Sequence, residues 1–317
     1  MTLPPAEMAH LTWPEAIVIG GLQGVAELFP VSSLGHSILI PALVGGTWAR
    51  DLDVSAPESP YLAFVVGLHV ATAVALIVYF WRDWLRILGG LVTSIVRRRV
   101  TEPDQRLAWL LVLATVPVGL SGLLLEHVFR VYLSKPVPTA AFLAMNGLVL
   151  LWAERLRHRD EATAGAENSH QHGDRTRPGA VRTEQTPDVR LSRLPVGRAV
   201  LIGTAQIAAL APGISRSGAT MVAGLRAGLS HADAARFSFL LATPVILAAG
   251  VLKLGDLAGP LGDGIRPQIL VGSLISGIGA YLSVRFLTRY FETRSLRPFG
   301  IYCLVAGLGC LGWFTLR

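Results

Sequence analysis

Long apolar runs alternate with short polar stretches along most of this chain. A membrane-spanning helix needs about 20 mainly apolar residues, and six runs are long enough. They cover residues 61–81, 107–125, 137–153, 237–254, 268–287 and 298–316. A further apolar run at 85–96 is too short to cross a bilayer, so we expect it to lie at the membrane interface. The pattern predicts an all-α polytopic membrane protein.

Two other apolar regions, 14–44 and 199–229, are interrupted by Pro, Gly and a cluster of polar residues. The first cluster reads Phe29-Pro-Val-Ser-Ser-Leu-Gly-His36, and the second reads Ala211-Pro-Gly-Ile-Ser-Arg-Ser-Gly-Ala-Thr220. A broken helix exposes backbone polar groups that lipid cannot satisfy, so it must be buried in protein or line a wet cavity. We therefore expect two re-entrant helical hairpins that carry polar residues at their tips.

The composition excludes a soluble globular domain. Of the 317 residues, 52% are hydrophobic and 15% are charged, whereas about a quarter of a soluble domain is charged. The same values exclude disordered and fibrous proteins. The net charge of +7 comes from 26 Arg and 2 Lys that lie mostly between the apolar runs, which fits membrane orientation better than nucleic-acid binding. No basic segment precedes an apolar stretch at the N-terminus, so no cleavable signal peptide is expected.

The distribution of charge predicts an orientation. Cytoplasmic loops of membrane proteins carry an excess of Lys and Arg. Residues 82–106, 154–198 and 289–297 are rich in Arg, so we expect them to be cytoplasmic; 48–60 and 255–267 are more acidic and are expected outside. The two hairpins then enter the membrane from opposite sides and each is followed by three spans, which is typical of an inverted-topology repeat.

A weak internal similarity supports this repeat. A shift of 183 positions superposes five identical residues of the two interrupted regions: Gly20 and Gly203, Gln23 and Gln206, Ala26 and Ala209, Ser32 and Ser215, and Gly35 and Gly218. We expect a first half at 1–157 and a second half at 191–317, whose polar tips meet in one site. The segment between them, 158–190, is too polar to bury a core, so we expect a disordered cytoplasmic linker.

An arginine in the second tip is the strongest indication of chemistry. An intramembrane arginine costs about 2.5–3.5 kcal/mol on insertion scales, so Arg216 needs a partner or a function. A guanidinium group binds phosphate through two hydrogen bonds. Ser215, Ser217 and Thr220 flank it in the sequence at the start of a helix, where anions are favoured. The tip therefore predicts a phosphate-binding site; a structural ion pair with Glu27 is a compatible alternative.

The first tip supplies acid–base groups. Glu27 lies in an apolar helix, and Ser32, Ser33 and His36 follow within nine residues. Glu27 could act as a general base, orient His36 or hold a divalent cation, and a serine could be the nucleophile. Opposite an arginine tip, these groups together favour a functional site over separate packing roles. For His69, in the middle of the first span, a structural role is as probable as a functional one.

The motifs from Gln23 to His36 and from Pro212 to Thr220 resemble those of the bacterial undecaprenyl-diphosphate phosphatases, the bacitracin-resistance family. Further similarity covers most of the chain except the linker. The resemblance implies a hydrolase of the bacterial inner (plasma) membrane that removes the terminal phosphate of undecaprenyl diphosphate and so recycles the lipid carrier for peptidoglycan and cell-wall synthesis. It also implies an inverted repeat with two re-entrant hairpins.

The resemblance implies roles for single residues as well. The expected catalytic residues are Glu27, Ser33, His36 and Arg216. The expected substrate-binding residues are Gln23, Ser32, Ser215, Ser217 and Thr220. Three positions depart from the family pattern, with Gln23 where a second Glu is usual, His69 in place of a Gln and Cys303 in place of an Arg. Because a glutamine has no formal charge, we expect Gln23 to act only through hydrogen bonds.

The first hypothesis is thus an integral membrane phosphatase. Glu27 and a divalent cation, Mg²⁺ or Ca²⁺, would polarise the diphosphate, and Ser33 or an activated water would attack it. The expected partners are a polyprenyl diphosphate lipid and the bilayer, a homodimer is left open, and no nucleic acid is expected. The second hypothesis is a transporter or flippase of polyprenyl phosphate or another anion, because inverted repeats with broken helices are typical of transporters. An inactive relative is the third, because of Gln23 and Cys303.

Overall fold

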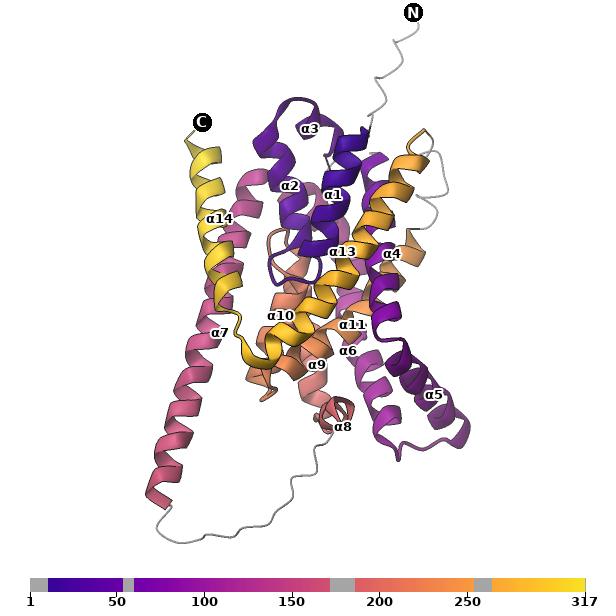
Figure 1. Ribbon diagram of the computed structural model, residues 1–317, viewed down its shortest axis with the longest axis vertical. Helices are drawn as coiled ribbons and strands as arrows, with labels where there is room; N and C mark the ends of the chain where they lie inside the picture. The colour runs from indigo at the N-terminus through magenta and orange to yellow at the C-terminus, as the bar shows by residue number, and fades with distance from the viewer. Residues whose placement is uncertain (1–10, 54–59, 172–185, 254–263, 317) are drawn as a thin grey trace, which may run out of the picture.

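The structure of the chain, a computed structural model, describes residues 11–53, 60–171, 186–253 and 264–316. Over these ranges every regular element is a helix, and the helices are gathered in one bundle (Figure 1). The first helix begins at the same end of the bundle at which the last helix finishes. The prediction of an all-α protein is confirmed.

Within these described ranges, six helices are long and apolar enough to cross a membrane, as the sequence predicts. They are α4 (Pro60–Tyr79), α6 (Pro103–Val128), α7 (Pro136–Gln171), α11 (His231–Leu252), α13 (Arg266–Thr293) and α14 (Arg297–Thr315). Most of them begin with Pro at the first or second position. A backbone N–H group there would have no partner within the helix, so its absence in Pro costs nothing. The chain is therefore a multi-pass membrane protein.

Two pairs of short helices occupy the interrupted apolar regions. The first pair is α1 (Trp13–Ala26) and α2 (Ser33–Val44). The second is α9 (Val196–Ala205), continued by a 3₁₀ turn, η2 (Gln206–Leu210), and α10 (Arg216–Arg226). The longest of these helices, α1, has 14 residues and extends about 21 Å. None of the four can cross a hydrocarbon core, which is about 30 Å thick.

The second helix of each pair begins at a serine cap. The hydroxyl group of Ser32 accepts a hydrogen bond from the Gly35 N–H group at 3.2 Å, and that of Ser215 accepts one from the Gly218 N–H group at 3.1 Å. Such a cap satisfies an N–H group of the first turn that has no partner within the helix. The two caps stand at positions that the shift of 183 residues superposes.

Close backbone contacts at two glycines, Gly20 and Gly203, bring short helices against long ones, and we call these contacts the glycine seams. α1 packs against α13, and α9 packs against α6. A methyl group on Gly20 would lie 2.6 Å from the carbonyl oxygen of Gly272, and one on Gly203 would overlap the carbonyl group of Ala114. No side chain fits at either position unless a backbone moves. The seams therefore fix where α1 and α9 stand in the bundle.

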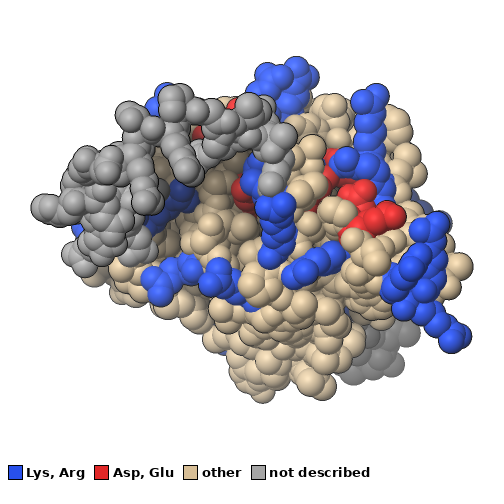
Figure 2. Space-filling model, turned by 90° about the horizontal axis from the view of Figure 1, so that it is seen from below, with Lys and Arg blue, Asp and Glu red and all other residues tan. Residues whose placement is uncertain are grey.

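One end of the bundle, which we call the basic end, carries α5 (Trp81–Arg97), α8 (Pro187–Ser192) and the connection between α13 and α14 (Figure 1). Seen from this end, Lys and Arg side chains are spread across the face of the molecule, around a smaller acidic group (Figure 2). α5 contains the apolar run predicted to lie at the membrane interface. The Arg-rich segments expected in the cytoplasm thus meet at one end of the structure.

Ion pairs hold α8 at the basic end. The Asp188 carboxylate contacts Arg86 of α5 at 2.6 Å and Arg236 of α11 at 2.8 Å. Arg190, also in α8, contacts Asp233 of α11 at 2.7 Å. These contacts hold α8, near the start of the second half, against α5 of the first half and α11 of the second.

The segment 158–190, expected to be disordered, is helical at both of its ends. α7 continues to Gln171, and α8 starts at Pro187; residues 172–185 lie outside the described ranges. Ala, Glu and Arg in the extension of α7 favour a helix, and adding turns to an existing helix is easier than starting a new one. The polar composition predicts the lack of a core, but it does not exclude a helix.

Candidate functional site

The two breaks, at 27–32 and 211–215, touch each other. The hydroxyl group of Ser32 in the first break accepts a hydrogen bond from the Gly213 N–H group in the second, at 3.2 Å. In return, the hydroxyl groups of Ser215 and Ser217 donate to the carbonyl oxygen of Phe29, at 3.4 and 3.1 Å. These bonds satisfy backbone groups that neither broken helix can satisfy alone. The polar tips therefore meet, as the sequence predicts.

A buried ion pair joins the tips. The Arg216 guanidinium group, at the first position of α10, donates to Oε1 of Glu27 at 2.8 Å. The side chains are 14% and 6% exposed, respectively. Each charge gives the other the partner that it needs in an apolar environment. The ion pair that the sequence offers as an alternative is present, and within the described part of the chain four of the five guanidinium N–H groups are left for other acceptors.

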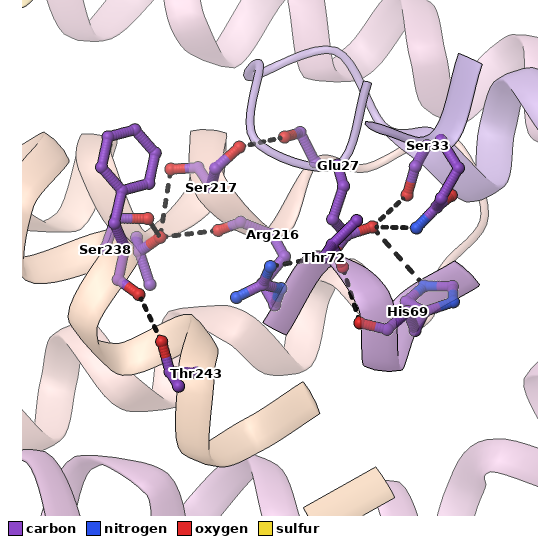
Figure 3. A network of polar contacts seen from close by, with 12 residues as sticks. Glu27, Ser33, His69, Thr72, Arg216, Ser217, Ser238 and Thr243 are labelled. Carbon is purple, nitrogen blue, oxygen red and sulfur yellow. Dashed lines mark hydrogen bonds and ion pairs between the residues drawn. The ribbon is translucent and has the colours of Figure 1, made fainter. Parts of the chain in front are cut away.

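The second carboxylate oxygen of Glu27, Oε2, contacts three more side chains (Figure 3). Oε2 accepts hydrogen bonds from the Gln23 amide at 2.9 Å and from the Ser33 hydroxyl group at 2.5 Å. His69 Nε2 lies 3.5 Å from the same oxygen. Gln23 thus contacts the site through a hydrogen bond, in agreement with the expectation for an uncharged residue. The Ser33 hydroxyl group and the carboxylate have the geometry of a nucleophile and its base.

These groups lie at the wall of a cavity of about 340 Å³. Glu27, Ser33, His69 and Arg216 all line it. Most of the remaining wall is apolar, and α4 and α11 contribute several of its residues, with Leu62, Val65, Val245 and Ile246 among them. A mainly apolar cavity with a few convergent polar groups is the usual form of a small-molecule site. A ligand with an anionic head and an apolar tail matches this division.

Ser217 and Thr220, predicted to contact phosphate, are not among the residues that line this cavity. Ser217 donates to Phe29, as described above. The Thr220 hydroxyl group donates to the carbonyl oxygen of Arg216 at 2.7 Å. It also lies 2.6 Å from the hydroxyl group of Ser238 in α11. Both hydroxyl groups hold the start of α10 in place. In this arrangement they support Arg216 rather than face a ligand, whereas Ser32 and Ser215 do line the cavity.

His36 also lies away from the cavity wall. Its Nδ1 is 2.7 Å from the carbonyl oxygen of Ser32, and its Nε2 is 2.7 Å from the hydroxyl group of Tyr302 in α14. The two rings are stacked with centroids 5.7 Å apart. His36 therefore ties α2 to α14, and the histidine that faces the cavity is His69. Sequence spacing cannot distinguish them, because the rotation of each helix decides where its side chains point.

Asn146 in α7 is a site residue that the sequence analysis missed. Its side chain is 2% exposed and contacts both tips. The amide group donates to the carbonyl oxygen of Pro30 at 3.1 Å, and its oxygen accepts from the Ser215 N–H group at 3.1 Å. A polar residue inside a spanning helix usually faces the interior of the bundle and marks a functional site. The position of this polar residue inside the apolar run 137–153 could have identified it from the sequence.

Gln206 is a second such residue. It is 1% exposed, lines the cavity, and its side-chain oxygen has no hydrogen-bond partner within the described part of the chain. The shift of 183 residues superposes it on Gln23, which contacts Glu27, so the repeat itself was the available indication. A buried acceptor without a partner is costly. Gln206 is therefore prepared to accept a hydrogen bond from a bound ligand.

The residues of the site fit a divalent cation only in part. Among the described residues, no group of three or more His, Cys, Asp or Glu side chains could hold a metal ion. Mg²⁺ is usually held by one or two carboxylates together with phosphate oxygens of the substrate and water. Glu27 offers one carboxylate, with the Ser33 hydroxyl group beside it. The site thus suits a cation that shares its ligands with a bound phosphate.

Removal of the Asn146 side chain should loosen the contact between the tips. Asn146→Ala leaves the Ser215 N–H group and the Pro30 carbonyl oxygen without this partner, so we expect a loss of about 2–4 kcal/mol of unfolding free energy. Reversible chemical unfolding in detergent micelles measures this loss. The control is Thr115→Ala, which removes a hydroxyl group bonded within α6 and should change stability by less than about 1 kcal/mol. Equal losses in both variants would contradict the bridging role.

Several known proteins are similar to this chain in sequence over nearly its whole length. The family model described as Bacitracin resistance protein BacA matches residues 16–309. A protein named undecaprenyl-diphosphatase from Mycolicibacterium paratuberculosis is 61% identical over 98% of this chain and 99% of its own length. Undecaprenyl-diphosphatase 1 from Frankia casuarinae is 52% identical over 98% of this chain and 100% of its own length. The chain therefore belongs to the bacitracin resistance protein BacA family.

Proposed function

We propose that this protein hydrolyses undecaprenyl diphosphate to undecaprenyl phosphate and inorganic phosphate. The observation that carries the proposal is the Glu27–Arg216 pair at the wall of a mainly apolar cavity, with the Ser33 hydroxyl group on the carboxylate. The relatives named undecaprenyl-diphosphatase support the choice of substrate. Such a reaction recycles a lipid carrier for cell-wall synthesis.

The arrangement supports Ser33 as the nucleophile. Its hydroxyl group attacks the terminal phosphorus while its proton passes to Oε2 of Glu27, 2.5 Å away. The bond from that phosphorus to the bridging oxygen breaks, and undecaprenyl phosphate leaves. Glu27 passes its proton to the departing undecaprenyl phosphate. Water then attacks the phosphoserine and gives a proton to Glu27, the bond from phosphorus to the Ser33 oxygen breaks, that oxygen takes up the proton from Glu27, and inorganic phosphate is released. The free N–H groups of Arg216 stabilise the charge on the phosphoryl oxygens in both steps.

The same site supports binding of Mg²⁺ or Ca²⁺ together with the substrate. Glu27 would hold the cation, and the diphosphate would supply further oxygen ligands. When bound, the cation neutralises charge on the diphosphate and polarises its phosphorus–oxygen bonds. Gln23 holds the carboxylate by a hydrogen bond and leaves the site with less negative charge than a second carboxylate would.

We also propose that both short helix pairs are re-entrant hairpins of an inverted-topology repeat, with halves at 1–157 and 191–317. Their length is insufficient to cross the membrane, which supports re-entry. The equivalent serine caps and the two glycine seams occur at superposed positions, which supports the internal repeat. The cavity includes residues near the start of α4 and the end of α11, which lie away from the basic end. This supports a site that opens to the outer side of a bacterial plasma membrane.

Labelling of introduced cysteines tests the proposed topology. In a background of Cys303→Ala and Cys310→Ala, Ala49→Cys follows the first hairpin and Arg193→Cys precedes the second; both positions are exposed. In intact cells, a membrane-impermeant maleimide should react with the first variant, and with the second only after the cells are opened. Labelling of both variants from the same side would exclude hairpins of opposite orientation.

Substitutions at the ion pair test the proposed catalysis. We expect Arg216→Gln, Glu27→Gln and Ser33→Ala each to lower the release of phosphate from undecaprenyl diphosphate by at least about 10²-fold, because each removes a group that acts on the transferred phosphoryl group. The matched control is Arg226→Gln on the same helix, where the exposed side chain contacts Trp152; it should keep near-normal turnover. Phosphate is measured with purified protein in detergent, where a transporter has no second compartment to fill. Normal turnover by Arg216→Gln would overturn the proposal.

Chelation tests the cation separately. If a divalent cation binds with the substrate, EDTA should abolish phosphate release, and Mg²⁺ or Ca²⁺ should restore it. The unfolding free energy in the absence of substrate should stay unchanged, because the protein alone offers only one carboxylate to the ion. Full activity in excess EDTA would exclude the cation while leaving the assignment of Ser33 and Arg216 intact.

A further inference from the structure

An open groove of about 430 Å³ runs along the last three turns of α13, at the basic end of the bundle. Leu282 and Phe286 line part of it, and both side chains are more than half exposed. Arg285 lies between these two residues in the sequence, Arg289 lies nearer the end of the helix, and Arg294 follows the last turn. The groove thus combines an apolar wall with three guanidinium groups.

These three arginines have no ion pair within the described residues, unlike three other arginines at this end. Arg86, Arg190 and Arg236 each contact an aspartate within 4 Å. Within the described part of the chain, the side chains of Arg285, Arg289 and Arg294 have no carboxylate within this distance and no hydrogen bond, although all three are exposed. Their charge is therefore available to an external anion. Three adjacent cations without counter-ions also repel one another, and a bound anion would relieve this repulsion.

The depth of the groove indicates what kind of anion it takes. Arg285 precedes the end of α13 by eight residues, or about 12 Å along the helix axis. A lipid-facing arginine at that depth extends its charged group towards the lipid headgroups. Leu282 lies about one turn further from this end of α13 than Arg285, so the groove keeps an apolar wall beyond the arginines. A lipid has this same order, with a phosphate at the interface and an acyl chain beyond it, whereas a soluble anion would leave the apolar part empty.

Aromatic packing makes the wall of the groove rigid. The Phe286 ring is stacked on Phe29 with centroids 6.0 Å apart, and the Tyr290 ring meets the edge of Phe299 at 5.4 Å. The Tyr290 hydroxyl group donates to the carbonyl oxygen of Ser295 at 3.3 Å. A wall that is already ordered loses little conformational entropy when a ligand binds.

We propose that this groove on α13 is a binding site for the phosphate headgroup of an anionic phospholipid, with an acyl chain along Leu282 and Phe286. The site is separate from the cavity at Glu27 and does not depend on the proposed reaction. Arg285 and Arg289 bind the phosphodiester from one helix face, and Arg294 binds it from the following turn. The membrane lipid thereby sets the depth of the end of α13.

Native mass spectrometry of the full chain in detergent tests this site, with phosphatidylglycerol as the probe and phosphatidylcholine as the uncharged comparison. Near a membrane surface each arginine contributes on the order of 1 kcal/mol to the attraction of anionic lipid. For Arg285→Gln with Arg289→Gln, we therefore expect the dissociation constant of the tightest phosphatidylglycerol to rise about 30-fold. The matched control, Arg97→Gln with Arg99→Gln, removes the same charge from an exposed part of the basic end and should keep the affinity within about threefold.

A second variant separates charge from folding. Arg285→Lys with Arg289→Lys keeps both charges, so it should retain phosphatidylglycerol, and both double variants should unfold at the midpoint of the parent protein. Equal binding of phosphatidylglycerol by the Gln variant and the parent would overturn the proposal. Equal binding of phosphatidylcholine, or displacement of phosphatidylglycerol by millimolar inorganic phosphate, would overturn it too, because the site would then recognise an apolar surface or a free ion.

Discussion

The whole arrangement depends on one buried ion pair between residues that are 189 positions apart. Neither the Glu27 carboxylate nor the Arg216 guanidinium group can be left alone in an apolar interior, where loss of one partner costs about 3–5 kcal/mol. Each charge sits at the edge of the break in its own half, Glu27 at the end of α1 and Arg216 at the start of α10. The pairing therefore brings the two halves together at their least regular points, and the same contact creates the polar wall of the cavity.

Backbone groups that the breaks expose are satisfied across the same contact. Ser32 and Ser215 cap their own helices and also bond the opposite break, and Asn146 bonds both. Because nearly every polar group near Glu27 is held by another, the site is ordered before a ligand arrives. Such preorganisation is where most electrostatic catalysis comes from. In the same way, Ser217 and Thr220, which are close to Arg216 in sequence, hold the start of α10 in place and do not line the cavity.

Much of the fold could be predicted because lipid restricts what a chain can do. Length and hydropathy identify the six spans, and Pro, Gly and polar residues locate both breaks. The pairing of Glu27 with Arg216 follows from the cost of burying either charge. The roles of His36 and Asn146 could not be predicted in this way, since they depend on how each helix is rotated, and packing against distant elements decides that. The helix at 158–171 was not predicted. The polar composition of this segment indicates that it cannot form a core, but it does not determine whether the backbone is helical.

The glycine seams have a consequence for where the two breaks lie. Two backbones in direct contact cannot slide past one another as layers of flexible side chains can, so α1 and α9 are locked to their long neighbours. A rocking exchange between two open states would have to break that lock in both halves at once. The first break, at the end of α1, therefore keeps a fixed position against α13, and the second, after α9, keeps one against α6.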